Sequence, residues 1–289
     1  MMNMDARIKK HLDLIGSIFP SAISSVIVHE EGDDFLVLEI NHGWMFRFPR
    51  NEVSAKALQV EKGFLAEFKA TSPLPVPDYR YIGGDFVGYP KIIGTLLDMD
   101  VFREQSVQSL NKIACQMGQF LSSVHTFPVE QARRLGLTEG WDGWQSKGFR
   151  HFQDVIAPRL SPVMRHAAMG CIERTMNQPF ETTVIHGDFS LEDHVFFDEK
   201  NQELCGVIDF ADVTLNDPAH DFQNIVEYGG EGFFNEVMEH YQGVPDPNLL
   251  QRTRFRIEAR PIFEAAYSSM FGFDERYKDR MAYIEQRYG

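Results

Sequence analysis

Residues 183–212 read TVIHGDFSLEDHVFFDEKNQELCGVIDFAD, and this stretch carries most of the information about the fold. Two apolar runs, 195–197 and 206–208, flank a polar turn and predict a small hairpin. Asp188 precedes the hairpin and Asp209 follows it, so we expect both carboxylates to project into one cleft. Phosphoryl transfer requires such a pair, because one carboxylate orients the acceptor hydroxyl and another holds the magnesium that neutralises the phosphates.

The chain before this stretch is predicted to contain mostly strands. Apolar runs at 26–28, 35–40 and 44–48 are rich in β-branched or aromatic residues, and Asn41-His42-Gly43 is typical of a hairpin turn. A helix is expected to follow over 54–70, where apolar residues fall on one face. The first part of the chain is therefore expected to form a small sheet with one helix.

The remainder of the chain is predicted to be mainly helical. Apolar residues at alternating three- and four-residue spacing predict helices over 107–124 and 163–172. The sequence as a whole thus predicts an α+β fold with two lobes. The first, β-rich lobe covers residues 1–93, and the second, mainly helical lobe covers residues 94–289 and includes the hairpin.

Composition and charge argue against several classes of protein. The 289 residues are 43% hydrophobic, as in a globular protein, and no apolar run approaches the roughly 18 residues of a membrane helix. Residues 1–8 lack the hydrophobic stretch of a secretion signal, so we expect a cytoplasmic location. We also expect a monomer that makes no contact with a membrane. The 28 basic and 42 acidic residues give a net charge of -14, which disfavours nucleic acid as a partner. Cys115, Cys171 and Cys205 are expected to be core thiols.

The motifs of the central stretch resemble those of a known enzyme superfamily. The order His186-Gly187-Asp188, a loop, an apolar strand and then Ile208-Asp209-Phe210 is similar to the aminoglycoside phosphotransferase and choline-kinase superfamily. Asp188-Phe189-Ser190 and His194 look most like the aminoglycoside 2''-phosphotransferases. Segments 46–49, 73–77 and 86–89 resemble the amino-terminal lobe of these enzymes. The resemblance spans roughly residues 25–270 and implies a two-lobed protein-kinase-like fold.

The resemblance implies a role for each residue of the motif. Asp188 corresponds to the catalytic base or orienting group and Asp209 to a magnesium ligand, while His186 and Ser190 support the catalytic loop. The family places its second metal ligand five residues after the catalytic aspartate, which here is Asp193. His194 lies immediately before the apolar strand, where that ligand should fall if the loop has one extra residue. Magnesium prefers oxygen, which favours Asp193, whereas the position before the strand favours His194.

Binding of ATP or GTP is implied for the amino-terminal lobe. Arg47, on a predicted strand, replaces the lysine that usually holds the phosphates, and Glu61, on the next helix, is its expected partner. Residues 31–34 correspond to a loop over the phosphates, although a single glycine between carboxylates is poorly suited to anions. Residues 90–93, which include Lys91 and Ile93, correspond to a segment whose backbone binds the purine. No GxxxxGK[ST] motif is present.

The acceptor is expected to be a small hydroxyl compound, and an aminoglycoside is implied by the resemblance. In the helix predicted after Asp221, Asn224, Glu227 or Tyr228, and Glu231 share one face beside Asp188. Acidic residues on that face would suit a cationic substrate. Asp221 itself is expected to cap or anchor a helix.

Two other functions stay open at the level of sequence. One is a kinase that acts on a macrolide, a choline-like amine, homoserine or another small metabolite, because fold does not fix substrate. The other is a nucleotide-binding module with weak catalysis, since Arg47 and the lengthened loop between Asp188 and His194 both depart from the family pattern.

Overall fold

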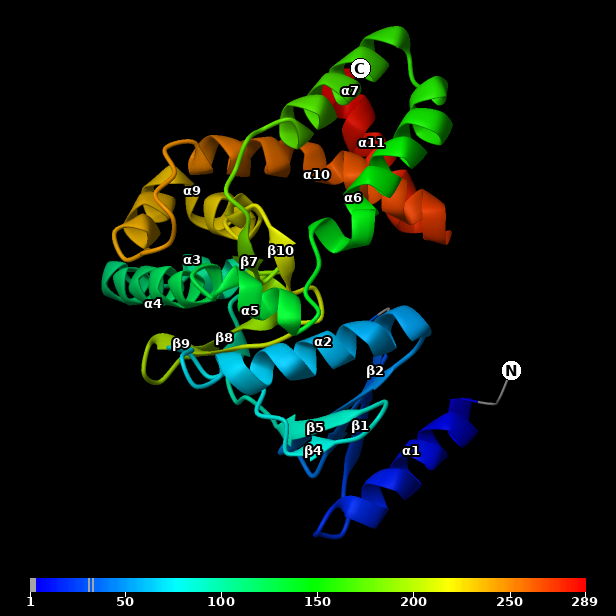
Figure 1. The fold of residues 1–289 in the computed structure, drawn as a ribbon, viewed down its shortest axis with the longest axis vertical. Coiled ribbons are helices and arrows are strands. Elements are labelled where there is room, and N and C mark those ends of the chain that lie inside the picture. The colour runs from blue at the N-terminus through cyan, green and yellow to red at the C-terminus, as the bar shows by residue number, and fades with distance from the viewer. Residues whose placement is uncertain (1–3, 31, 33) are drawn as a thin grey trace. The chain divides into compact units, whose positions relative to one another are not determined.

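The computed structural model describes residues 4–30, 32 and 34–289. The chain divides into two compact units. One holds the described residues up to Gln59 together with Pro77–Lys91, and the other holds Val60–Val76 and Ile92–Gly289. Figure 1 labels most of their helices and strands. None of the described helices is long and apolar enough to cross a membrane.

The first unit is built on an antiparallel five-stranded sheet with the order β1-β2-β3-β5-β4. Its strands are β1 (Val26–His29), β2 (Phe35–Ile40), β3 (Trp44–Pro49), β4 (Tyr81–Ile82) and β5 (Val87–Pro90). The predicted turn between β2 and β3 is present, with Asn41 and His42 at φ angles of 53° and 55°. The Asn41 side-chain oxygen accepts hydrogen bonds from the backbone amides of Ser24 and Ser25, which holds the turn against the start of β1.

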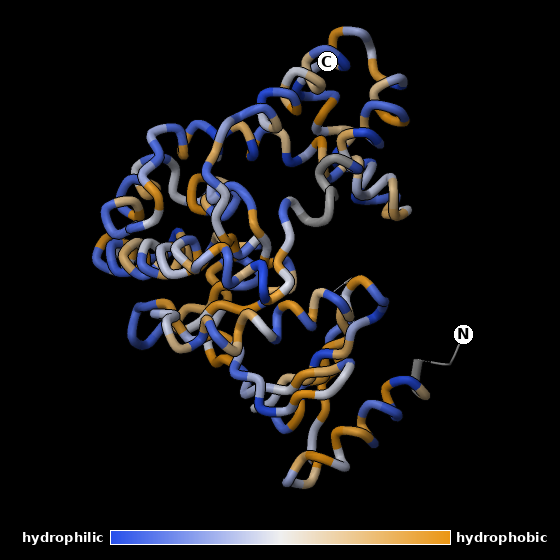
Figure 2. The backbone as a smooth tube through the Cα atoms, viewed as in Figure 1, coloured by the Kyte–Doolittle hydropathy of each residue, from blue (hydrophilic) through white to orange (hydrophobic). Residues whose placement is uncertain are grey.

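Helix α1 (Met4–Ile18) was not predicted from the sequence. Hydrophobic and hydrophilic residues alternate along it, as Figure 2 shows, and its buried Ile15 packs with Phe46 and Phe48 of β3. The helix therefore covers apolar side chains of the sheet.

Helix α2 (Glu52–Phe68) follows β3, as predicted, and its second half belongs to the second unit. Phe64 and Phe68 are fully buried, and their rings contact Phe127 and Phe210. The sequence-based division at residue 93 assigns this part of α2 to the first lobe, whereas its aromatic side chains pack within the second unit.

The second unit is mainly helical and carries two small sheets. Its further helices are α3 (Met99–Arg103), α4 (Val107–His125), α5 (Val129–Arg134), α6 (Gly140–His151), α7 (Pro162–Met176), α8 (Leu191–His194), α9 (Gln223–Met238), α10 (Leu249–Phe271) and α11 (Asp274–Tyr288). A π-helical turn η1 (Phe152–Ile156) and two short 3-10 helices, η2 (Ala157–Arg159) and η3 (Pro218–His220), complete the set of described helices. The strands are β6 (Thr95–Leu96), β7 (Thr183–Ile185), β8 (Val195–Asp198), β9 (Glu203–Val207) and β10 (Thr214–Asn216).

Strands β8 and β9 form the hairpin that the sequence predicted, and β6 pairs with β8 on its other side. Strands β7 and β10 form a separate antiparallel pair, in which Ile185 is opposite Thr214. Because β7 leads into His186 and β9 leads into Ile208, the two sheets place the loops that follow them close together. The observed architecture is α+β, with one β-rich unit and one mainly helical unit, as predicted.

Candidate active site

The loop that follows β7 lies directly against the loop that follows β9. Gly187 has a φ of 88°, and a Cβ atom there would be 2.2 Å from the backbone oxygen of Asp212. Only glycine fits this combination of left-handed backbone and close approach. The glycine of the His-Gly-Asp motif thus allows the segment carrying Asp188 to reach the segment carrying Asp209.

The carboxylate of Asp221 anchors the backbone of His186 and Gly187. Its carboxylate accepts hydrogen bonds from the backbone amide of His186, at 2.7 Å, and from that of Gly187, at 3.0 Å. His125 Nε2 lies 3.0 Å from the same carboxylate. Burial alone would raise the pKa of Asp221, but the hydrogen bond and charge of His125 and the nearby His186 hold it below its usual value. The anchoring expected of Asp221 therefore acts on the loop that carries Asp188.

His186 bridges the same two loops through its ring. Its Nδ1 accepts a hydrogen bond from the backbone amide of Asp188, at 3.3 Å, and its Nε2 donates one to the Ile208 carbonyl, at 3.2 Å. Burial lowers the pKa of His186 to about 4, so the ring is neutral and one nitrogen can accept while the other donates. The ring thus fixes the residue before Asp209 relative to Asp188.

The carboxylate of Asp188 faces a cavity, and its side chain is 53% exposed there. The surrounding protein is nevertheless dense enough for desolvation to raise the pKa of Asp188 to about 6, against the opposing charge of His194. A carboxylate with a pKa near 6 is still ionised at neutral pH and is a stronger base than an ordinary aspartate. It is therefore suited to accept a proton from a substrate hydroxyl.

His194, at the end of α8, lies between Asp188 and Asp209. Its Nδ1 donates a hydrogen bond to the Asp188 backbone oxygen, at 2.8 Å, and its Nε2 lies 3.6 Å from Asp209 Oδ2. Burial would lower the pKa of His194, but Asp188 and Asp209 outweigh it and raise the pKa above its usual value. Asp193 instead accepts a hydrogen bond from the Ser190 hydroxyl, at 2.8 Å. Of the two candidate metal ligands, His194 is the one placed beside Asp209.

The chemistry of these groups fits a divalent cation that is also held by a nucleotide. Because Nδ1 of His194 is occupied by a backbone carbonyl, Nε2 is the nitrogen left for a ligand. Metal–ligand bonds of about 2.1 Å allow two ligand atoms 3.6 Å apart to share one ion. Among the described residues, no three His, Cys, Asp or Glu side chains are arranged to hold a metal. Magnesium commonly takes only one or two protein ligands and completes its shell with phosphate and water oxygens.

The residues expected to bind nucleotide phosphates are each buried in their own unit. Arg47 of β3 is 4% exposed, and its guanidinium carbon lies 4.1 Å from the centre of the Phe35 ring. Glu61 of α2 is fully buried and accepts a hydrogen bond from the backbone amide of Phe210, at 3.3 Å. Glu61 is thereby tied to the residue that follows Asp209.

The residues expected near the purine are also held by neighbours. Lys91 Nζ lies 2.8 Å from Glu39 Oε2, and this hydrogen bond lowers the pKa of the 3% exposed Glu39. Ile93 has an exposed side chain, and its backbone oxygen accepts a hydrogen bond from the Cys205 thiol, at 3.3 Å. In the segment expected to cover the phosphates, Asp34 accepts a hydrogen bond from Ser54 Oγ at 2.7 Å, whereas Glu31 and Asp33 lie outside the described residues.

The cavity beside Asp188 has a volume of about 610 Å³, which is in the range of small-molecule sites. It lies within the second unit, between the loops at Asp188 and Asp212 and helices α7, α9 and α10. Asn224, one of the residues expected at the acceptor site, lines it. Arg256 and Arg260 of α10 line it too, and neither was singled out from the sequence.

Glu227 and Glu231, the carboxylates expected to bind the acceptor, do not line this cavity. Glu227 is ion-paired with Arg260, and Glu231 with Arg254. The expectation assumed one continuous helical face, but Gly230 has a φ of 66° and a ψ of -167°, which breaks α9 between the two residues. Glu227 and Glu231 therefore do not share one continuous helical face, and their role at the acceptor stays a prediction.

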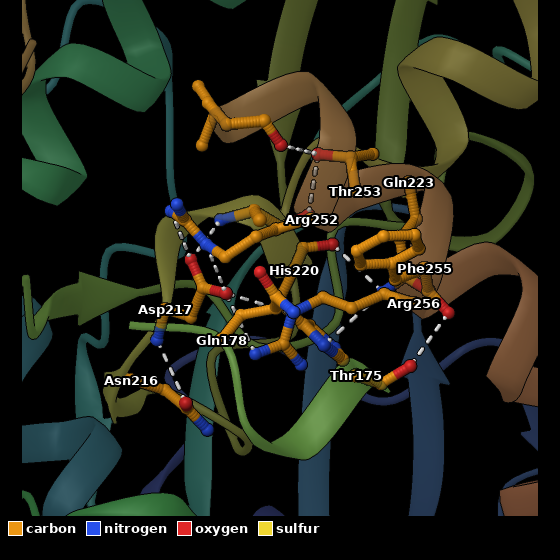
Figure 3. A network of polar contacts seen from close by, with 12 residues as sticks. Thr175, Gln178, Asn216, Asp217, His220, Gln223, Arg252, Thr253, Phe255 and Arg256 are labelled. Carbon is orange, nitrogen blue, oxygen red and sulfur yellow. Dashed lines mark hydrogen bonds and ion pairs between the residues drawn. The ribbon is translucent and has the colours of Figure 1, made fainter. Parts of the chain in front are cut away.

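A buried ion-pair network supports the α10 wall of the cavity (Figure 3). Asp217 is 1% exposed and accepts hydrogen bonds from Arg252, at 2.9 and 3.0 Å, and from Arg256, at 3.0 and 3.2 Å. Burial would raise the pKa of Asp217, but the hydrogen bonds from Arg252 and the charge of Arg256 keep it below its usual value. The recurrence of arginine at 252, 256 and 260 is the sequence signal for this wall, because residues four apart share one helical face.

Residues 26–256 match the phosphotransferase enzyme family (APH), and the chain belongs to that family. It is a phosphotransferase, and the α+β fold class expected from the sequence is confirmed. Among curated proteins, the Bacillus subtilis (strain 168) protein YcbJ is 22% identical over 228 residues, which are 74% of each chain.

Two solved structures illustrate the likeness in fold. The structure of the GDP and kanamycin complex of APH(2")-IIia superposes with a TM-score of 0.85 at 25% identity, over 96% of this chain and 97% of the other. Macrolide 2'-phosphotransferase type I superposes with a TM-score of 0.76 at 20% identity, over 98% of both chains.

Proposed function

We propose that this chain is a small-molecule kinase that transfers the γ-phosphoryl group of ATP or GTP to a hydroxyl group of a compound bound in the cavity beside Asp188. The observation that carries the proposal is the position of Asp188. Its carboxylate opens onto a cavity of about 610 Å³, has a pKa raised to about 6, and belongs to a loop that is held through its backbone amides.

In this mechanism Asp188 orients the acceptor hydroxyl and takes its proton as the oxygen attacks phosphorus. Asp221 and His186 keep the loop in place, since both bind its backbone amides and remain in one protonation state near neutral pH. Such positioning matters because phosphoryl transfer depends mainly on alignment and electrostatic stabilisation.

Asp209 and His194 are the proposed holders of magnesium, which would neutralise charge on the donor's phosphates. Asp193 instead supports the loop through Ser190. Arg47 is assigned to the phosphates and Glu61 to its support, with Lys91 and Ile93 close to the base. Nucleotide binding is thus assigned to residues 1–93, and catalysis and acceptor binding to residues 94–289.

Two classes of acceptor follow from relatives of this fold. An aminoglycoside is supported by the likeness to APH(2")-IIia, whose structure contains kanamycin. A macrolide or another weakly charged compound is supported by the likeness to macrolide 2'-phosphotransferase and by the two arginines of the cavity wall. Phosphoryl transfer at Asp188 is common to both.

The test compares wild type with Asp188→Asn, using magnesium, ATP or GTP and a panel of hydroxyl compounds, with product detected by ³¹P NMR. We expect Asp188→Asn to lower transfer by about 10³-fold, because the asparagine amide is not a base. The nucleotide dissociation constant should change by less than about twofold, since Asp188 does not hold the donor. Asp279→Asn, on the exposed side of α11, is the matched control. Equal turnover in the Asp188→Asn variant would overturn the assignment, and nucleotide binding without any turnover in wild type would favour a binding module.

A further inference from the structure

We propose that the acceptor is a neutral or acidic hydroxyl compound with an apolar body and a carbonyl or carboxylate group, and that it is not a polyamine. The proposal rests on phosphotransfer at Asp188 and adds the chemical class of the acceptor. Four features of the cavity wall carry it: the direction of two ion pairs, a buried amide without a partner, exposed apolar side chains, and the position of the carboxylates.

The ion pairs of the wall present their positive members to the cavity. Arg256 and Arg260 line it, whereas their carboxylate partners, Asp217 and Glu227, do not. Arg256 is 9% exposed and Arg260 is 37% exposed, so both guanidinium groups are partly desolvated. Both arginines are neutralised by carboxylates that do not line the cavity, so a substrate with several ammonium groups would meet guanidinium donors, which offer it no acceptor, instead of free carboxylates. Carbonyl and carboxylate oxygens match the donor geometry of guanidinium groups.

Asn216 adds a neutral donor to the same cavity. It is 5% exposed, and its Oδ1 accepts a hydrogen bond from the Asp217 backbone amide, at 2.8 Å. Its Nδ2 is buried without a hydrogen-bond partner, although the residue lines the cavity. A buried donor left unsatisfied is costly, and a ligand oxygen would remove that cost. An ammonium group has only donor atoms, so it would leave Nδ2 without a hydrogen-bond partner.

Apolar side chains fill much of the remaining wall. Met176 and Phe180 line the cavity and are 37% and 40% exposed, so both keep accessible apolar surface. Phe263 and Tyr267 of α10 line it as well. Exposed apolar residues gathered around a hollow are typical of a site that buries an apolar ligand surface.

The carboxylates that do line the cavity are few and belong to its loop side. They are Asp188, Asp212 and Glu139, of which Asp188 is assigned to catalysis and Glu139 is paired with Arg133 at 2.8 Å. The net charge of -14 is therefore not concentrated at the acceptor site. An ammonium-binding wall would require unpaired carboxylates where α10 supplies arginines.

The decisive experiment compares acceptors that share a framework and differ in charge. Kanamycin and its fully N-acetylated derivative share a ring framework, and phenyl glucoside and phenyl glucuronide share an apolar body. Binding to wild type is measured by ligand-observed NMR, and turnover by ³¹P NMR. We expect phenyl glucuronide and acetylated kanamycin to bind at least about tenfold more tightly than kanamycin, which corresponds to about 1.4 kcal/mol.

Substitution of the wall tests the cause. Arg260→Gln removes a cation and leaves Glu227 unpaired beside the cavity, so it should raise the dissociation constant of phenyl glucuronide about tenfold and lower that of kanamycin. Arg174→Gln is the matched control, because Arg174 forms a similar pair with Glu258 of α10 but does not line the cavity. It should leave both dissociation constants unchanged. Thermal unfolding of both variants verifies that they are folded.

Several outcomes would overturn the inference. Tighter binding of kanamycin than of its acetylated derivative would do so, as would binding of none of the neutral or acidic compounds at millimolar concentration. An Arg260→Gln variant with wild-type affinities would also contradict it. If product formation still requires Asp188, these results contradict only the acceptor class, and the proposed phosphotransfer stands. If product formation does not require Asp188, the proposed function itself is wrong.

Discussion

The buried carboxylate of Asp221 accepts a hydrogen bond from the backbone amide of His186 over 2.7 Å. Through this bond Asp221 holds the loop that carries Asp188, the proposed catalytic carboxylate, although the two residues are far apart in sequence. The same carboxylate reaches His125 of α4, whose other ring nitrogen lies 2.8 Å from the Tyr241 hydroxyl. The loop is thus braced through a buried polar network, and such networks tolerate the loss of one member poorly.

Asp221→Asn should reduce both stability and turnover. The amide retains the shape but has one acceptor oxygen instead of two and no charge for His125, so we expect a loss of about 3 kcal/mol in the free energy of unfolding. Turnover should fall at least about tenfold through misplacement of Asp188. Urea denaturation and steady-state kinetics measure the two effects. Tyr241→Phe removes only the outermost hydrogen bond and should cost about 1 kcal/mol. If Asp221→Asn were as stable and as active as wild type, the bracing role would be wrong.

Turnover should have an acidic limb near pH 6. The pKa of Asp188 is raised to about 6 by burial, and the protonated form cannot take a proton from the acceptor. Below pH 6, kcat/KM should therefore fall about tenfold per pH unit, and above it the rate should level off. The profile is recorded at saturating magnesium and nucleotide, with samples returned to pH 8 to verify that activity recovers. A limb near pH 4 would show that the carboxylate behaves as an ordinary solvent-exposed aspartate.

The ion pairs of Asp217 should stabilise the fold at neutral pH and lose this effect in acid. Its folded pKa lies below the unfolded value of about 3.9, so its stabilising effect is present above that pH and is lost as pH falls through the folded pKa. At pH 7, Asp217→Asn leaves Arg256 without its buried counter-charge and Arg252 paired with Asp246 alone, and should lower the unfolding free energy by about 3 kcal/mol. The difference from wild type should shrink below about pH 4.

The control for Asp217→Asn is Glu231→Gln, which breaks the exposed pair with Arg254 and should cost less than about 0.5 kcal/mol at any pH. Both are measured by urea denaturation across the pH range. A constant deficit for Asp217→Asn down to pH 3 would mean that packing, and not charge, accounts for its effect.

The magnesium requirement should separate His194 from Asp193. Asp209→Asn and His194→Ala should each raise the magnesium concentration for half-maximal turnover at least about tenfold, because each removes a proposed ligand. Asp193→Asn loses only the acceptor for the Ser190 hydroxyl and should shift it less than about twofold. A larger shift for Asp193→Asn than for His194→Ala would reverse the assignment.

Strongly patterned parts of the fold could be predicted from the sequence. Strand β2 occupies Phe35–Ile40 as expected, because a β-branched and aromatic run between turn residues has few alternatives. Helix α4 was visible from the regular spacing of its buried residues. Helix α1 was missed because its buried residues are few and are interrupted by charged ones, so its partners on the sheet decide its conformation.

The candidate site divides in the same way. Asp188, Asp209 and His194 could be found because they belong to one short local motif. The roles of Arg256 and Asn216 could not be predicted in this way. The role of Arg256 depends on which member of an ion pair faces the cavity, and that of Asn216 on a buried amide nitrogen without a hydrogen-bond partner. Glu227 and Glu231 were expected on one continuous helical face, but the helix is broken between them at Gly230, whose left-handed backbone a helical repeat does not reveal.

The two arginines of the α10 wall, Arg256 and Arg260, differ in how much stability is lost when each is replaced. Arg256 shares Asp217 with Arg252 in the interior, so its loss would disturb the core, whereas Arg260 and Glu227 form a half-exposed pair that can be exchanged at little cost in stability. Substitutions at residues 227 and 260 can therefore change which compounds are accepted while the fold is retained. We expect relatives of this chain to differ in acceptor first through substitutions at such partly exposed ion pairs. Arg256, which is costly to replace, should limit the range of compounds that can be accepted.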